Sequence, residues 1–352
     1  MHKTMKLAAK APRCGSVARF ALAACAALAT AALAASHTAP LQLLGHTDIP
    51  GYTGDFDAIT PDPARNRLFM AAEDHGTVEV FDLATGKHLR TLTTFGTPHQ
   101  IFLVPGTHRM IVTDGGRDGT AIVDTRTYKV LGHIKLAPGA DEAYYDPSTR
   151  HYFIVTGGED VDMKVCYLNE VDPWTGRVLA QLKFDSNHTE TLRAEQHGNR
   201  MFINVADKNE VDVLSKSPLE VIARWPIVGA KKNLTLALDE PDHRLFVVTR
   251  DPTRMFVLDT DNGRTVQVLD VAAVNDGVFW DAKRRRLYVP GAAAGEVGVY
   301  QVGQGGQVKE IGRVPSAAGG KSGAFSPRLD EMWVAASPGK RTGGEILWYR
   351  VH

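Results

Sequence analysis

One short pattern recurs seven times along the chain and constrains its fold more than any other feature. Each copy starts with a basic or polar residue, continues with an apolar residue and ends with an aromatic or apolar one. We call the first residue the anchor; the anchors are Arg67, Arg109, His151, Arg200, Arg244, Arg286 and Glu331. They are spaced by 42, 42, 49, 44, 42 and 45 residues. Near-constant spacing of this length is typical of folds built from one repeated supersecondary unit.

Each repeat carries the signals of four short β-strands. Strand-like runs of four to seven residues are separated by Gly, Asp, Asn and Pro, and helical periodicity is absent. An acidic residue stands five positions before five of the seven anchors, where it suits a tight turn. Four strands in each of seven units predict an all-β fold, a single seven-bladed β-propeller with four-stranded blades. The alternative, two packed β-sandwiches, does not require seven equal units.

The two ends of the repeat array predict how the ring closes. The seventh unit supplies only three strands, around residues 322–326, 331–336 and 345–351. Its missing outer strand is expected from Leu41–Gly45, near the start of the first unit. A ring closed by its first strand has no exposed sheet edge.

The first 35 residues read as a cleaved signal peptide rather than as part of the fold. Five basic residues and no acidic residue precede a 16-residue run of mostly Ala and Leu, Phe20 to Ala35, which is shorter than the roughly 20 residues that span a bilayer. Ala32-Leu33-Ala34 suits cleavage near Ala35 or Ser36. We therefore expect a propeller of residues 36–352, periplasmic in a bacterium or secreted, with no transmembrane segment. Cys25 lies in a lipoprotein-like box, but the apolar run continues past it, which disfavours a lipid anchor.

Charge narrows the choice of partners. The formal net charge is zero, but loss of five basic residues with the leader leaves 35 Lys+Arg against 40 Asp+Glu, or −5. Residues 230–352 hold 17 basic against 14 acidic residues, so blades 5 to 7 form the more cationic side. This asymmetry predicts a protein or small anionic ligand at that side. The overall charge does not favour nonspecific DNA binding, which needs a broad basic surface.

Several segments resemble a known repeat family. Residues 80–87, 122–130 and 96–99 read VFDLATGK, IVDTRTYKV and GTPH. They are similar to the YVTN, or YncE-like, β-propeller repeat, and the similarity covers nearly the whole chain after the leader. The resemblance implies the propeller fold. It also implies DNA as a further partner, because some YncE-like propellers bind DNA.

The column ten residues before each anchor marks the expected binding face. This position falls where each innermost strand begins, at one mouth of the central channel. It holds Asp57, His99, Asp141, Glu190, Leu234, Asp276 and Lys321. Six of these seven residues are ionisable, whereas a buried position would favour apolar residues. The ring is either a binding site or the ordinary wet lining of a propeller channel.

The candidate ligand-binding residues come from these strand starts and from the loops between second and third strands. They are His75, His99, Arg117, Glu142, His188, Glu190, Lys232, Asn233, Arg254, Asp276 and Lys321. Among them, Arg117, Lys232, Arg254 and Lys321 are the expected charge partners of an anionic ligand. Two loops are longer than their equivalents, by six residues within Gly157–Val165 and by four within Ser337–Gly344. We expect these loops to flank the channel mouth and shape a ligand site.

Catalysis has less support in the sequence than binding. There is no G-x-S-x-G nucleophile elbow, G-x-G-x-x-G or P-loop. Cys166 is interpreted as a buried strand residue rather than a reactive thiolate. A divalent metal held by His99, Glu142, His188 and Glu190 is chemically reasonable, although no short-range metal motif fixes such a site.

The sequence therefore predicts an exported, monomeric, noncatalytic propeller that binds a ligand or a macromolecular partner at the channel mouth and requires no cofactor. The alternative is a metal-assisted hydrolase of lactonase type at the same face, with Glu142 or Glu190 as ligand or base. That alternative rests on analogy between folds.

Overall fold

The computed structural model describes residues 39–116 and 119–352, which form one compact unit. Within these ranges, no helix has both the length and the apolar character needed to cross a bilayer. The predicted signal peptide, residues 1–35, lies outside the described residues, as does the candidate Arg117.

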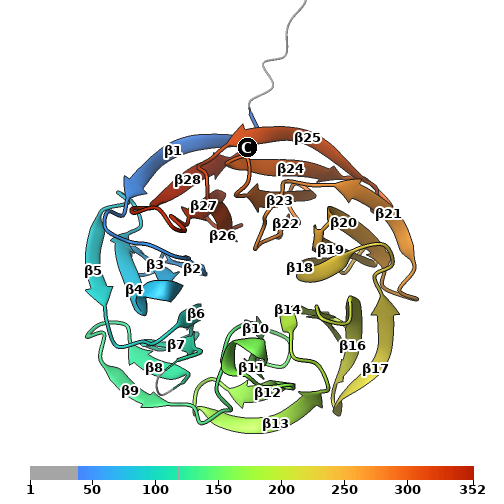
Figure 1. The fold of residues 1–352 in the computed structure, drawn as a ribbon, viewed down its shortest axis with the longest axis horizontal. Coiled ribbons are helices and arrows are strands. Elements are labelled where there is room, and N and C mark those ends of the chain that lie inside the picture. The colour runs from blue at the N-terminus through green and yellow to red at the C-terminus, as the bar shows by residue number, and fades with distance from the viewer. Residues whose placement is uncertain (1–38, 117–118) are drawn as a thin grey trace, which may run out of the picture. The chain divides into compact units, whose positions relative to one another are not determined.

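Seven four-stranded antiparallel sheets stand in a ring around a central channel (Figure 1), which confirms the predicted seven-bladed β-propeller. Blade 1 contains β2 (Ile59–Asp62), β3 (Arg67–Ala72), β4 (Thr77–Asp82) and β5 (His88–Leu92). Blade 2 contains β6 (Pro98–Leu103), β7 (Arg109–Asp114), β8 (Ala121–Asp124) and β9 (Val130–His133). Blade 3 contains β10 (Ala143–Asp146), β11 (His151–Gly157), β12 (Cys166–Asp172) and β13 (Arg177–Phe184). Blade 4 contains β14 (Thr189–Ala194), β15 (Arg200–Val205), β16 (Glu210–Lys216) and β17 (Leu219–Pro226).

The remaining blades follow the same plan. Blade 5 contains β18 (Lys231–Asp239), β19 (Arg244–Asp251), β20 (Thr253–Asp259) and β21 (Thr265–Asp270). Blade 6 contains β22 (Phe279–Asp281), β23 (Arg286–Gly291), β24 (Glu296–Val302) and β25 (Val308–Pro315). Blade 7 contains β26 (Gly320–Ser326), β27 (Glu331–Ala336), β28 (Glu345–Val351) and β1 (Leu41–Asp48). Two short 3-10 helices, η1 (Glu73–His75) and η2 (Glu159–Val161), lie in the loops after β3 and β11.

The anchors of the sequence repeat are structural landmarks. All seven are the first residues of the second strands, β3, β7, β11, β15, β19, β23 and β27. These strands are buried almost continuously after the anchor, because neighbouring blades cover both of their faces. Outer strands such as β17 instead alternate between partly buried and exposed residues. The repeated pattern thus marks the second strand of each blade, which the neighbouring blades cover on both faces.

The ring closes as predicted, through a strand from the N-terminal end of the propeller. β1 pairs with β28 from Leu41 opposite Val351 to Asp48 opposite Glu345, three residues beyond the predicted Leu41–Gly45. Its register shifts between Leu43 and Gly45. The closing blade therefore combines the first and last strands of the described chain.

Hydrophobic clusters fill the spaces between adjacent blades. One cluster joins Phe56, Met70 and Phe81 near blade 1 to Trp333 and Ile346 of blade 7. Similar clusters join the other neighbours, and they absorb most of the large apolar side chains. Because the core lies between blades rather than on the axis, the inner strands present their other side chains to the channel.

Candidate functional site at the channel mouth

The seven inner strands run in the same direction along the channel and lie closest to its axis (Figure 1). We call the end where these strands begin the channel mouth, and the end where they finish the opposite mouth. The column ten residues before the anchors falls at or just before the strand starts, as predicted, and brings Asp57, His99, Asp141, Glu190 and Asp276 to the channel mouth or its lining. Leu234 is the exception, because it is buried in the blade.

His99 is the centre of the densest group of charges. Its Nδ1 atom lies 3.0 Å from Asp57 Oδ2 and 3.2 Å from Asp141 Oδ1, so it contacts carboxylates from both neighbouring blades. Glu73, on η1, adds a third carboxylate. One ligand atom each from Asp57, Glu73 and His99 can be chosen so that all three lie within 4.8 Å of one another. The site therefore concentrates more negative than positive charge in a small volume.

Burial and mutual repulsion shift the pKa values of these groups. Burial raises the pKa of Glu73 to about 7, and burial together with neighbouring carboxylates also raises the pKa of Asp141. Burial alone would lower the pKa of His99, but Asp141 and Asp57 outweigh it and raise that pKa to about 10. His99 is thus an imidazolium at neutral pH. The carboxylates around it are buried close together, which disfavours their ionised forms.

A second imidazole lies at the start of blade 4, on the other side of blade 3 from His99. His188 Nε2 is 2.6 Å from Glu190 Oε1, and its Nδ1 is 3.0 Å from Glu159 Oε1 on η2. The hydrogen bond to Glu190 is the main cause that raises the pKa of His188 to about 9. Burial raises the pKa of Glu190 to about 7. His188 is therefore a second imidazole that contacts two carboxylates, although it uses both ring nitrogens whereas His99 contacts both of its carboxylates through Nδ1.

Lys321 occupies the corresponding position of blade 7 and is already bonded. Its Nζ lies 2.8 Å from Asp55 Oδ2 and 2.8 Å from Asp276 Oδ2. Asp276 also pairs with Arg250 from blade 5. Burial would lower the pKa of Lys321, but the two carboxylates raise it. Lys321 and Arg250 are consequently neutralised by the protein's own carboxylates.

A cavity of about 250 Å³ lies between the two imidazoles. Glu73, His99, Asp141, His188 and Glu190 line it, together with residues of the long blade-3 loop such as Glu159 and Val161. Thr189 and Cys166 also reach it, and Cys166 is buried, as predicted, with its pKa raised by burial. The cavity combines several oxygen donors and two imidazoles and is large enough for an ion with its water or for one small polar group.

The two long loops have different surroundings. The blade-3 loop forms one wall of this cavity, in agreement with its expected place at the mouth. The blade-7 loop pairs with the segment that follows β1, through a bridge between Gly54 and Gly339. Residues of this loop, including Arg341, line a separate cavity of about 350 Å³ together with Asp48 of β1.

Other candidates from the sequence lie outside the cavity. His75 Nε2 accepts a hydrogen bond of 2.8 Å from the Thr53 amide and holds the segment before β2. Asn233 is fully buried and donates to Asn204 Oδ1 and to the Glu210 carbonyl oxygen, so it joins blades 4 and 5. Lys232 is exposed, and Arg254 pairs with Asp270 at 3.3 Å. Glu142 lines the channel one residue after Asp141, where Gln100 Nε2 lies 3.5 Å from its carboxylate.

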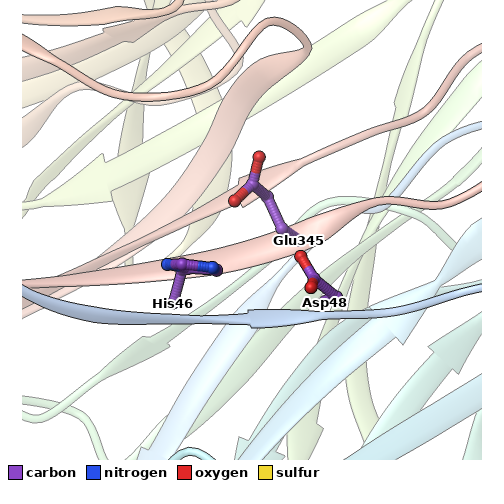
Figure 2. A group of neighbouring side chains, drawn as sticks. All are labelled: His46, Asp48 and Glu345. Carbon is purple, nitrogen blue, oxygen red and sulfur yellow. The ribbon is translucent and has the colours of Figure 1, made fainter.

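Ring closure brings together another small group of possible metal ligands, His46, Asp48 and Glu345 on β1 and β28 (Figure 2). His46 and Asp48 lie two residues apart on β1 and so share a face, and Asp48 stands directly opposite Glu345 on β28. We call these three residues the rim group. Both β1 residues are exposed, and exposed acidic groups are common without an ion. The rim group carries two carboxylates on β1 and β28 and is therefore a matched control for the carboxylates at the channel mouth.

The candidate ligand-binding residues predicted from the sequence do not include Glu73, which lies in the same loop as His75, or a second column of channel residues. Seven positions before each anchor, closer to the opposite mouth, stand Thr60, Phe102, Tyr144, Arg193, Ala237, Phe279 and Ala324. All seven line the channel or the opposite mouth. This column lies three residues after the column that contains His99, so the same spacing from the anchors predicts it.

No protein-family model matches the chain, and no curated protein matches it either. The geometry of the channel and its two mouths is therefore the basis for the functional proposal.

Proposed function

We propose that the protein is an exported, noncatalytic binding propeller whose channel mouth takes a cationic group of its ligand or partner. The observation that carries this proposal is the placement of Asp57, Glu73 and Asp141 around the single imidazole of His99. The leader-like composition of residues 1–35 supports export. N-terminal sequencing of the secreted protein tests that part, with a new terminus at Ala35 or Ser36 as the expected result.

Electrostatics favours a cation over an anion at this mouth. Burial and the neighbouring carboxylates raise the pKa values of Glu73, Asp141 and Glu190, which means that their ionised forms are disfavoured as the site stands. A cation that enters the cavity relieves this repulsion, whereas an anion increases it. Relief of the repulsion between these carboxylates therefore contributes to the free energy of cation binding.

This proposal replaces the expectation of an anionic ligand at blades 5 to 7. Lys321 is held between Asp55 and Asp276, and Arg250 is paired with Asp276. An anionic ligand would have to displace these carboxylates. A protein partner would instead present a Lys or Arg side chain, and DNA phosphates would be repelled by the acidic mouth.

Titration with two cationic probes tests the proposal. Mn²⁺ and spermidine, followed by isothermal titration calorimetry and for Mn²⁺ also by electron paramagnetic resonance, are expected to show saturable binding of one cation with a Kd of about a millimolar or tighter. The double variant Asp57→Asn with Glu73→Gln removes two charges from the mouth and is expected to weaken binding at least about tenfold, since each lost charge contact is worth roughly 1.5–3 kcal/mol.

The rim group provides the matched control. Asp48→Asn with Glu345→Gln removes the same number of charges from the outer strands and is expected to leave the affinity within about twofold. Absence of saturable binding for both probes contradicts the proposal. So does loss of binding in the rim variant alone.

A metal-assisted hydrolase is a second candidate, favoured by one observation: the close approach of ligand atoms from Asp57, Glu73 and His99. A divalent ion there would polarise a lactone carbonyl and activate water. Glu142 and Glu190 line the adjoining cavities and would act as base. Metal-stimulated hydrolysis of simple lactones that is lost in Glu142→Gln or Glu190→Gln would favour this candidate, and binding of Mn²⁺ without hydrolysis would reject it.

A further inference from the structure

The opposite mouth of the channel is aromatic where the channel mouth is acidic. A cavity of about 600 Å³ opens there, at the ends of the inner strands. Its walls include the side chains of Tyr144, Tyr145, Phe279, Trp280 and Phe325. Three prolines, Pro147, Pro241 and Pro327, form part of its edge. A cavity of this size, lined mainly by aromatic and other apolar residues with a few polar groups such as Arg193, Gln196 and Glu240, is typical of small-molecule sites.

Arg193 is the cation of this aromatic mouth. It lies on β14 and lines both this cavity and the channel cavity of about 420 Å³ that continues from it. Its Nη1 donates a 2.7 Å hydrogen bond to the carbonyl oxygen of Leu192, and its guanidinium carbon lies 5.6 Å from the centre of the Tyr144 ring. No carboxylate in the described parts of the chain forms an ion pair with it. Arg193 thus differs from Arg250 and Lys321, which are paired.

Glu142 lines the same channel cavity as Arg193 but forms no ion pair with it. Its carboxylate is contacted by Gln100 at 3.5 Å instead. Burial, with Asp141 and Glu190, raises the pKa of Glu142 well above its ordinary value, which favours its neutral form. Burial also lowers the pKa of Arg193, as expected for a cation without a close counter-charge. A partly buried guanidinium without a carboxylate partner is costly unless a ligand supplies one.

We infer that the opposite mouth binds a small aromatic carboxylate, with its ring among Tyr144, Phe279 and Phe325 and its carboxylate on Arg193. The guanidinium offers paired N–H donors that match a carboxylate. A single unpaired cation favours a monoanion over a phosphate dianion, because the carboxylate of Glu240 lines the same cavity. The aromatic walls favour a planar ring, whose face and edge contacts add to the apolar area it buries.

This inference does not depend on the proposed function. The ligand has the opposite charge from the one proposed for the channel mouth, and the residues that hold it line a different cavity. Binding of an aromatic acid without binding of Mn²⁺, or the reverse, would therefore separate the two.

A charge series of probes on the unmodified protein provides the first test. Benzoate and phenylacetate are expected to bind with 1:1 stoichiometry by calorimetry and to change the fluorescence of Trp280, which lines the cavity. Neutral benzyl alcohol and cationic benzylamine are expected to bind at least about tenfold more weakly, because they lack the charge-assisted hydrogen bonds to Arg193. No binding of either acid at about 10 mM, or equal binding of acid and alcohol, overturns the inference.

Variants then assign the site. Arg193→Gln is expected to weaken benzoate binding at least about tenfold and to abolish the preference for benzoate over benzyl alcohol. Phe279→Leu keeps an apolar side chain but removes a ring, and is expected to weaken binding about threefold to tenfold. Arg126→Gln, on an exposed hairpin of blade 2, is the matched control and is expected to change nothing. Should Arg193→Gln fail to fold, Phe279→Leu and the probe series still test the site. Wild-type affinity for benzoate in Phe279→Leu, together with equal binding of the acids and benzyl alcohol, contradicts the proposed site.

Discussion

His99 and Asp57 form an ion pair across two adjacent blades, with His99 Nδ1 3.0 Å from Asp57 Oδ2. The two residues are ten positions before their respective anchors, so the same point of two sequence repeats meets at the channel mouth. Asp141, at the same point of the third repeat, completes the arrangement at 3.2 Å. Strand order and repeat length thus place three titratable groups together that are 42 residues apart in sequence.

This arrangement predicts a pH-dependent contribution of His99 to stability. The pKa of His99 is raised to about 10 by Asp141, Asp57 and Glu73. Its stabilising effect is therefore present below the unfolded value of about 6.5 and is lost as pH rises through 10. His99→Gln is expected to lower the free energy of unfolding by about 1.5–3 kcal/mol near pH 6.5 and by much less near pH 10.

Urea unfolding at several pH values, followed by tryptophan fluorescence, measures this difference. His197→Gln is the control, because its side chain is 90% exposed, and it is expected to change stability by no more than about 0.5 kcal/mol. A destabilisation by His99→Gln that does not vary with pH would show that His99 does not act as a charged partner of these carboxylates.

Lys321 distinguishes a cationic ligand from an anionic one. Lys321→Met leaves Asp55 without its lysine partner and Asp276 with Arg250 alone, so the mouth becomes more negative and the affinity for Mn²⁺ is expected to rise about twofold to tenfold. Lys232→Met, at an exposed position away from the cavity, is expected to leave it unchanged. Calorimetric titration of the two variants provides the measurement. A fall in Mn²⁺ affinity, or a gain in Lys232→Met equal to that in Lys321→Met, would argue against an acidic binding mouth.

The long blade-3 loop is predicted to contribute to the site. Deletion of Asp160–Lys164 removes part of the cavity wall and leaves Glu159 and the paired residues Gly157 and Cys166 in place. We expect a cation affinity reduced by about threefold or more, since the cavity becomes more open to water and its charges are better screened. The unfolding transition shows whether the fold is kept. Unchanged Mn²⁺ affinity in the folded deletion variant would separate the loop from the site.

Ring closure by β1 makes a prediction about two glycines on outer strands. A Cβ atom at Gly45 would lie 2.6 Å from Trp348 Cζ2, whereas a Cβ at Gly132 on β9 would meet nothing within 4 Å. Gly45→Ala is expected to lower the free energy of unfolding by about 1–3 kcal/mol through overpacking. Gly132→Ala is expected to leave it unchanged or to raise it slightly. Thermal unfolding compares the pair, and equal effects would mean that β1 does not close the ring against Trp348.

The fold could be predicted because the repeat reports burial directly. Each anchor is the first residue of a strand that is covered on both faces, so apolar residues recur at a fixed distance from it in every blade. The extent of β1 was less predictable. Its last residues, including His46 and Asp48, alternate outward on an edge strand, where apolar patterning is weak.

The site could be predicted in position but only partly in chemistry. The counted column found His99, Glu190 and Asp276, but it could not show that Asp55, 266 residues away, already binds Lys321. Asn233 is buried and donates hydrogen bonds to Asn204 and Glu210 of blade 4, a contact between blades that spacing in the sequence does not reveal. Arg193 was overlooked because its significance depends on the absence of a paired carboxylate among the described residues, which spacing cannot reveal.

Anomalous difference density from crystals soaked with Mn²⁺ tests the central claim most directly, because it locates the cation. The account predicts a peak in the cavity at the channel mouth, within coordination distance of oxygen atoms of Asp57 and Glu73 and close to His99. A peak only at the rim group of His46, Asp48 and Glu345, or no peak at a saturating Mn²⁺ concentration, would contradict it.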